Sequence, residues 1–129
     1  MSKLLIVDDS ADILETMKYV LERKGYIVRT LINADNIYPE INEFQPDLLI
    51  LDIRVAGEDG REICKELKKS VQYSDLSVLM FSASPKLLED YESFYADDFM
   101  EKPFQLAELV EKIKLVLGRT SMRQKSFQS

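Results

Sequence analysis

Three aspartates and a lysine stand directly after short apolar segments of the chain. They are Asp8 and Asp9 after one such segment, Asp52 after another and Lys102 after a third. A carboxylate at the end of a buried strand is costly to desolvate unless a cation compensates its charge. The pattern therefore indicates one site that binds a cation and handles a phosphoryl group.

The three aspartates are suited to hold a hard divalent cation. Mg²⁺ and Mn²⁺ prefer oxygen ligands, and such an ion would relieve the repulsion among Asp8, Asp9 and Asp52. An aspartate can also attack phosphorus and form an aspartyl phosphate, whose charge needs a positioned cation nearby. Lys102 is suited to pair with a phosphate oxygen, and the hydroxyl of Ser82 can donate a hydrogen bond to another.

The composition is that of one soluble domain and excludes several kinds of site. The chain has 129 residues, 46% of them hydrophobic, and a net charge of -6, which argues against direct nucleic-acid binding. The absence of histidine excludes His-dependent catalysis and His-ligated zinc, and the single cysteine, Cys64, excludes an internal disulfide. Cys64 falls in a helical apolar pattern and is expected to pack in the core. With no apolar run of about 20 residues and no signal-peptide pattern, we expect a cytoplasmic protein without a membrane segment.

Five short apolar segments alternate with amphipathic stretches. The expected strands cover residues 4–7, 26–31, 48–51, 78–81 and 99–100. The first, third and fourth are almost continuously apolar, which is typical of parallel strands covered on both faces. The pattern predicts an α/β fold: a flavodoxin-like, doubly wound parallel sheet of five strands in the order 2-1-3-4-5, with five helices on both faces. Ligands of such sheets bind at the carboxyl ends of the strands, where the charged residues stand.

Capping and stop signals predict where the helices begin and end. The first should end before Gly25, and the second should cover about residues 34–44, kinked or begun at Pro39. The third should begin near Asp59, and the fourth should use Ser84 as its N-cap.

The sequence predicts one domain over residues 1–118. Gly118 should end the fifth helix. Residues 119–129 contain three basic residues and no acidic one, and they lack apolar periodicity. We expect them to form a basic, disordered tail or the start of a linker.

Four segments in this order resemble the receiver domain of response regulators, the phospho-accepting part of two-component signalling. The spacing between the segments carries the resemblance: 43 residues from Asp9 to Asp52, 30 from Asp52 to Ser82 and 20 from Ser82 to Lys102. The resemblance covers about residues 2–118. The four segments are Ile6-Val7-Asp8-Asp9-Ser10, Leu51-Asp52-Ile53-Arg54-Val55-Ala56-Gly57-Glu58-Asp59-Gly60, Met80-Phe81-Ser82-Ala83 and Ala96-Asp97-Asp98-Phe99-Met100-Glu101-Lys102-Pro103-Phe104.

The resemblance implies chemical roles at this edge of the sheet. Asp52 would be the phosphorylation site, and Asp8 and Asp9 would hold Mg²⁺ or Mn²⁺ together with Asp52 and the backbone carbonyl of Arg54. Lys102 would pair with the phosphate. The domain would catalyse only its own phosphorylation and dephosphorylation, and would not be a turnover enzyme.

The resemblance also implies switching and tuning roles. Ser82 would be the switch hydroxyl and Phe99 the switch aromatic, and the peptide bond before Pro103 would be cis. Arg54 and Ser84 would tune dephosphorylation. Our hypothesis is that Arg54 hinders the attacking water and lengthens the phosphorylated lifetime.

The implied partners are a sensor histidine kinase or a histidine phosphotransfer protein, and a downstream protein or fused effector. The signalling surface would be the fourth helix, fifth strand and fifth helix, through which a homodimer could also form. No nucleic acid or membrane is expected as a direct partner.

Two positions and the length of one segment depart from the family pattern. Ala56 replaces the usual proline, which would leave the loop after Asp52 less rigid. The segment between Ser82 and Lys102 is about two residues short, and Tyr95 replaces a glycine. The last two changes concern the switch surface and not the phosphorylation chemistry.

Other function classes stay open. A phosphotransfer enzyme of the haloacid-dehalogenase type would carry an Asp-x-Asp pattern after the first strand, which Asp8-Asp9-Ser10-Ala11 lacks. A flavodoxin-like binding module would need a phosphate loop there, where two aspartates would repel a phosphate. A degenerate receiver that acts only as an interaction module is the remaining alternative, against which the intact acidic set argues.

Overall fold

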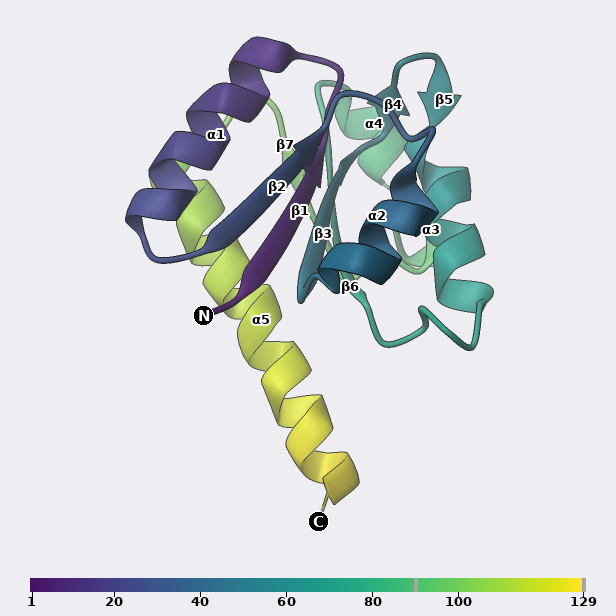
Figure 1. Cartoon of the computed structure of the whole chain (residues 1–129). Coiled ribbons are helices and arrows are strands. Elements are labelled where there is room, and N and C mark those ends of the chain that lie inside the picture. Colours follow the sequence, from purple (N-terminus) through teal and green to yellow (C-terminus); the bar gives the residue numbers. More distant parts are fainter. Residues whose placement is uncertain (90, 129) are drawn as a thin grey trace.

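A parallel β-sheet forms the centre of the computed structural model, which describes residues 1–89 and 91–128 (Figure 1). Its strands are β1 (Lys3–Val7), β2 (Ile27–Leu31), β3 (Leu48–Asp52), β6 (Ser77–Ser82) and β7 (Asp98–Glu101). They pair in the order β2-β1-β3-β6-β7, and each neighbouring pair is parallel. The predicted fold class and strand order are confirmed.

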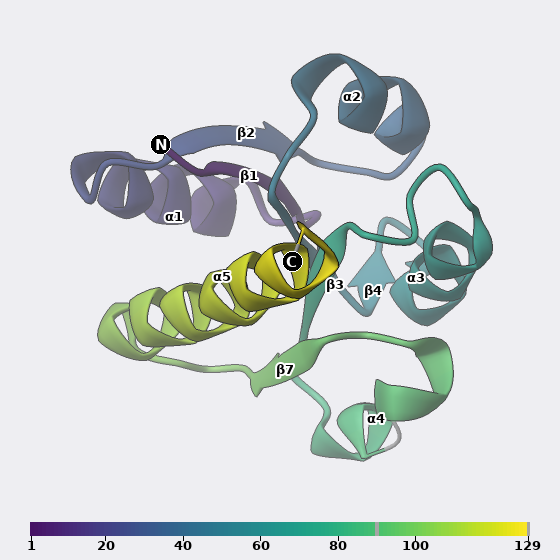
Figure 2. The ribbon, with the colours of Figure 1, turned by 90° about the horizontal axis from the view of Figure 1, so that it is seen from below.

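Helices cover both faces of this sheet. They are α1 (Ala11–Arg23), α2 (Ile37–Phe44), α3 (Gly60–Lys69), α4 (Pro85–Leu88) and α5 (Leu106–Gln128), with a 3-10 turn, η1 (Tyr91–Phe94), after α4. Figure 2 shows α1 and α5 on one face of the sheet and α2 and α3 on the other. None of the helices described is both long and apolar enough to cross a bilayer.

The fourth helix begins after Ser84, as predicted, and is short. It consists of a single turn of four residues, with η1 following as a separate turn. Only fifteen residues connect β6 to β7, and the chain reverses at Tyr95, which has a φ of +65°. A left-handed residue ends helical structure, so η1 ends at Phe94, directly before Tyr95.

The fifth helix does not stop at Gly118 as predicted, but continues to Gln128. Gly118 lacks the positive φ that would turn the chain out of the helix. A glycine inside a helix costs only about 1 kcal/mol relative to alanine, and residues 119–128 contain no proline. The structure therefore gives residues 119–128 as helix, where the sequence predicted a disordered tail. A linker beginning there, and a domain boundary at residue 118, stay predictions.

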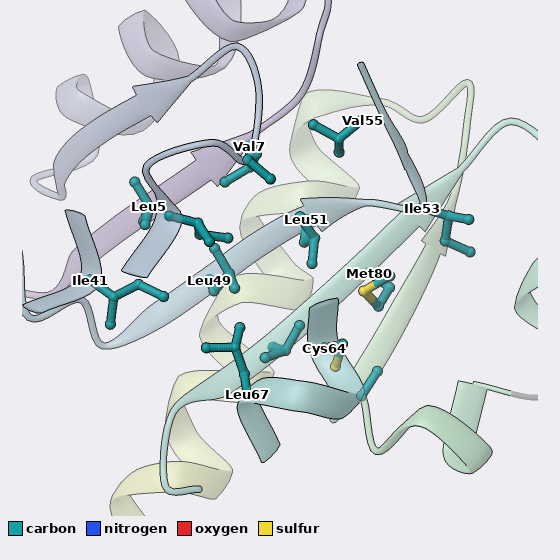
Figure 3. Packing of buried hydrophobic residues seen from close by; sticks show 14 of the residues in the cluster. Leu5, Val7, Ile41, Leu49, Leu51, Ile53, Val55, Cys64, Leu67 and Met80 are labelled. Atoms are coloured by element: carbon teal, nitrogen blue, oxygen red, sulfur yellow. The ribbon is translucent and has the colours of Figure 1, made fainter. Parts of the chain in front are cut away.

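Two apolar cores fill the space on either side of the sheet. One lies under α2 and α3 and joins strand residues such as Leu5 and Leu49 to Cys64 of α3 (Figure 3). The other lies under α1 and α5 and contains Leu4 and Ile113. Neighbouring residues of a strand point to opposite faces, so both faces of β1 and β3 must be apolar. Cys64 packs in the core, as predicted.

A short β-hairpin with two residues in each strand follows β3, and the sequence pattern did not predict it. Strand β4 (Arg54–Val55) pairs antiparallel with β5 (Glu58–Asp59). The turn residues Ala56 and Gly57 have φ values of +48° and +86°. Positive φ at both central residues is the geometry of a type I′ hairpin turn. The hairpin ends at Asp59, which caps α3 as predicted by accepting a hydrogen bond from the Arg61 amide.

The first residue of β7 is tied to α5 by two ion pairs. Asp98 is buried, and its Oδ1 lies 3.2 Å from Lys112 Nζ. Its Oδ2 lies 3.0 Å from Nη1 of Arg119. Because Arg119 follows Gly118, the second ion pair anchors the helix beyond its predicted end. In Figure 1, α5 then extends past the edge of the sheet where the strands begin.

Candidate functional site

Three residues at the carboxyl ends of β1, β3 and β7 meet in one ion-pair cluster. Lys102 Nζ lies 2.8 Å from Asp8 Oδ2 and 2.8 Å from Asp52 Oδ2. The side chain of Asp8 is 1% exposed and that of Asp52 is 12% exposed. The backbone amide of Lys102 donates to the Ser82 carbonyl at 2.8 Å, which fixes the chain after β7 against β6. The parallel sheet therefore brings together the charged residues that the sequence singled out.

Asp9 completes a group of three carboxylates. Asp8, Asp9 and Asp52 each offer an oxygen, and these oxygens lie within 4.8 Å of one another. Asp9 is exposed, whereas the other two are buried. Oxygen donors at this spacing fit the preference of Mg²⁺ for carboxylates combined with water. The site therefore fits the predicted cation, and the role of the Arg54 carbonyl as a further ligand stays a prediction.

Backbone amides hold two of the carboxylates in place. Asp8 Oδ1 accepts a hydrogen bond from the Ser10 amide at 2.9 Å, and Asp52 Oδ1 accepts one from the Arg54 amide at 3.1 Å. Each of these carboxylates thus uses one oxygen toward the backbone and the other toward Lys102. The local chain after each strand orients the carboxylate toward the shared site.

Burial and ion pairing act against each other in this cluster. Burial raises the pKa of Asp52, and the hydrogen bonds from Lys102 and from the Arg54 amide offset only part of that rise. For Lys102, burial lowers the pKa, but hydrogen bonds to Asp52 and Asp8 outweigh it and raise the pKa above its usual value. Lys102 therefore stays charged, and Asp52 is a more basic carboxylate than an exposed aspartate.

The predicted switch residues lie on β6 and β7. Ser82 is buried at the end of β6, and its Oγ accepts a hydrogen bond from the Ser84 amide at 3.0 Å. Phe99 is 36% exposed, and Lys112 Nζ lies 6.0 Å from its ring centroid. The peptide bond between Lys102 and Pro103 is cis, as predicted. Ser82 thus lies beside the acidic cluster, while Phe99 faces outward.

Gly60 supports the site although no catalytic role was predicted for it. A Cβ atom at this position would collide with the Asp52 carbonyl oxygen and approach Ile53 Cα to 3.1 Å. The Gly60 amide also donates a hydrogen bond to the Ile53 carbonyl. The sequence contained one signal, a glycine directly after the N-cap Asp59. Only glycine lets the start of α3 lie this close to the backbone of Asp52.

Ala56 is a second contributor that sequence reasoning missed. Its backbone amide donates a hydrogen bond to Asp9 Oδ2 at 3.2 Å, across 47 residues of sequence. The sequence held only a weak signal, the Ala-Gly pair in the loop after Asp52, because a backbone donor depends on the turn and not on the side chain.

Comparison with known proteins identifies the family. The model of the response regulator receiver domain matches residues 4–114. The chain is 30% identical over 122 residues to the DNA-binding dual master transcriptional regulator RpaA of Synechocystis sp., covering 93% of this chain and 51% of RpaA. It thus spans about half the length of that curated relative.

Solved structures agree in fold. NtrX from Brucella abortus is 30% identical with a TM-score of 0.89, and the match covers 98% of this chain and 29% of NtrX. The response regulator TrrA from Thermotoga maritima, solved in complex with Mg²⁺-BeF, is 32% identical with a TM-score of 0.80; the match covers 90% of this chain and 99% of TrrA. The chain therefore belongs to the response regulator receiver domain family.

Proposed function

We propose that this receiver domain accepts a phosphoryl group on Asp52 in a reaction that requires Mg²⁺. The observation that carries the proposal is the placement of Lys102, which lies 2.8 Å from both Asp8 and Asp52 within a group of three carboxylates. A nucleophilic carboxylate, a positioned cation and oxygen ligands for a metal are the parts that phosphoryl transfer needs.

In the proposed reaction, an oxygen of Asp52 attacks the phosphorus of a phosphodonor. The bond from phosphorus to the donor's leaving atom breaks as the bond to Asp52 forms. Asp8 and Asp9 would hold Mg²⁺, which when bound neutralises charge on the phosphoryl oxygens. Lys102 exchanges its contact with Asp52 for one with a phosphoryl oxygen, because the new group carries more negative charge than the carboxylate.

Phosphorylation would then shift an equilibrium between two conformations of the domain. Ser82 lies beside the site and can donate its hydroxyl to a phosphoryl oxygen. Phe99 stands on the neighbouring strand β7, and the partly exposed ring would turn inward when Ser82 moves. The face formed by α4, β7 and α5 would carry the change to a partner.

The proposed donor is a sensor histidine kinase or a histidine phosphotransfer protein, and the output would pass to a downstream protein or a fused effector. The domain would act as a switch and not as a turnover enzyme. Its family membership supports this assignment. A homodimer through α4, β7 and α5 and a cytoplasmic location stay predictions from the sequence.

The direct test is phosphorylation by a small donor. The wild type and Asp52→Asn are incubated with acetyl phosphate and Mg²⁺, and the intact mass of each protein is measured. We expect the mass of one phosphoryl group on the wild type, no addition on Asp52→Asn, and no addition on the wild type when EDTA removes the metal. A wild type that gains no mass would contradict the proposal.

Arg54 would set the lifetime of the phosphorylated state. Its exposed side chain stands two residues beyond Asp52, at the start of the hairpin. A long side chain there can obstruct the water that attacks the phosphoryl group. We expect Arg54→Ala to lose phosphate several-fold faster than the wild type, measured by mass after removal of the donor. Arg61→Ala is the control, because Arg61 is engaged with Asp59 on α3. Equal rates for wild type and Arg54→Ala would refute this role.

A further inference from the structure

The metal ligand Asp9 differs from its two neighbours in how it is held. Asp8 and Asp52 are buried, and each is bound by a backbone amide close in sequence and by Lys102. Asp9 is exposed, and the hydrogen bond described for its side chain comes from the Ala56 amide in the β4–β5 hairpin. An exposed aspartate samples several rotamers, so this hydrogen bond selects one of them.

The conformation of Ala56 is what allows its amide to reach Asp9. Ala56 adopts a φ of +48°, a left-handed conformation that is uncommon for a residue with a side chain. Such a residue persists only where its surroundings hold it there. A proline could not take this place, because its ring fixes φ near -65° and it has no amide hydrogen to donate.

The hairpin that carries Ala56 is anchored at its base. Val55 is fully buried in the core under α2 and α3 (Figure 3), and it pairs with Glu58 across the hairpin. Gly60, directly after the hairpin, packs against the backbone of Asp52. The tip is thereby fixed relative to the phosphorylation site, and its amide points across to the loop after β1.

We infer that Ala56 is a positioning residue for the metal site: its left-handed turn directs a backbone N–H to Asp9 Oδ2 and holds this carboxylate beside Asp8 and Asp52, where the three would bind the ion. This inference rests on the proposed magnesium site. Groups that orient metal ligands typically change metal affinity 10- to 100-fold when they are removed. The hydrogen bond also joins the chain after Asp52 to the chain after Asp8, so the two loops that meet at the metal are coupled.

The test compares variants at one position. Ala56→Pro removes the N–H and forbids the left-handed φ, whereas Ala56→Gly keeps the N–H and adopts a positive φ without strain. A third protein carries L-lactic acid at position 56, so that an ester oxygen replaces the amide N–H and the side chain is unchanged. Mg²⁺ affinity is measured for each by titration of backbone amide NMR shifts in the absence of a phosphodonor.

We expect Ala56→Pro and the ester protein to bind Mg²⁺ about tenfold more weakly than the wild type. Ala56→Gly should bind within about twofold of the wild type and melt at a higher temperature, because glycine relieves the left-handed strain. Equal Mg²⁺ binding by the ester protein would overturn the inference, because the hydrogen bond would then have no effect on the metal site. Tighter binding would also overturn it, because the hydrogen bond would then compete with the ion.

Failure of the inference about Ala56 can be distinguished from failure of the proposed function. If wild type binds Mg²⁺ and accepts phosphate on Asp52 while the ester protein binds Mg²⁺ equally well, the inference fails and the proposed function stands. If wild type shows no Mg²⁺-dependent shifts at Asp8, Asp9 and Asp52, the proposed metal site itself fails, and the inference fails with it.

Discussion

Lys102 compensates two buried carboxylates at once, so its removal tests how the site is stabilised. In Lys102→Ala, Asp8 and Asp52 would repel each other without a cation between them. Breaking a buried ion pair is strongly destabilising, and we expect a loss of about 3 kcal/mol in the free energy of unfolding in EDTA. Mg²⁺ should restore more stability to the variant than to the wild type, since the ion takes over the compensation.

Urea denaturation with EDTA and with Mg²⁺ measures both effects. Lys114→Ala is the matched control, because Lys114 is exposed and its contact with Glu111 at 3.7 Å lies on the helix surface. It should lose less than about 0.5 kcal/mol. Equal losses for the two variants would show that the buried cluster does not depend on Lys102.

Cys64 provides a pH-dependent prediction. Burial raises the pKa of its thiol to about 12 from an ordinary value of 9.0. Between these values, the unfolded chain has released the thiol proton while the folded chain retains it. The contribution of Cys64 to the free energy of unfolding therefore decreases as pH rises through this interval. Below the interval, this contribution does not change with pH.

We expect wild type to lose more stability than Cys64→Ala between pH 8 and pH 10.5, measured by urea denaturation of both proteins at each pH. The difference between the proteins isolates the thiol from the lysines and tyrosines that titrate in the same range. A thiol reagent at pH 8 should label Cys64 only after unfolding. Rapid labelling of the folded protein would contradict the burial of Cys64.

At the scale of single residues, side-chain chemistry was predictable and backbone chemistry was not. Asp8, Asp52 and Lys102 were found because charges at strand ends are unusual and their spacing is informative. The roles of Gly60 and Ala56 were not predicted. Gly60 contributes by its close approach to the Asp52 backbone, and Ala56 contributes by the direction of its backbone N–H. Every residue but proline has an amide, so its use leaves no trace in the residue type.

At the scale of helices and strands, two glycines in helices allow opposite predictions for the stability of their alanine variants. Gly60 begins α3 against the backbone of Asp52, so Gly60→Ala must displace the helix or the strand end. We expect a loss of about 1–3 kcal/mol in the free energy of unfolding. Gly118 lies inside α5 with open space around its Cβ position. Gly118→Ala should therefore add up to about 1 kcal/mol.

Circular dichroism during thermal and urea unfolding measures both changes, and Gly118→Ala should also increase the helical signal. A loss of stability in Gly118→Ala would indicate that α5 ends at Gly118 after all. An unchanged free energy of unfolding in Gly60→Ala would show that the start of α3 can move away from the Asp52 backbone without loss of stability.

The strands were predicted more accurately than some helices for a physical reason. Strands buried on both faces must be apolar throughout, as in residues 48–51, and this leaves a clear pattern. Single turns such as α4 and η1 have no periodicity long enough to recognise. The end of α5 was misjudged because glycine stops a helix only where the chain leaves the helical φ, and composition does not reveal φ.

At the scale of the whole molecule, the alternation of strands and helices was sufficient to predict the architecture. Right-handed crossovers allow few ways to arrange five such units, and the order β2-β1-β3-β6-β7 is the predicted one. The hairpin β4–β5 was not predictable in this way, because its two-residue strands lie outside the main sheet. The overall architecture follows from hydrophobic pattern, whereas the details around the site follow from turns.

The ion pairs between Asp98 and α5 have a mechanical consequence. Asp98 is the first residue of β7, the strand that ends next to Lys102. Arg119 of α5 forms an ion pair with Asp98. Past that point α5 runs on for about nine residues, or roughly 14 Å at about 1.5 Å per residue. A rotation of the helix by ten degrees about this ion pair would move its far end through on the order of 2 Å. A shift of β7 would therefore reach the part of α5 that lies beyond the sheet through the ion pairs of Asp98.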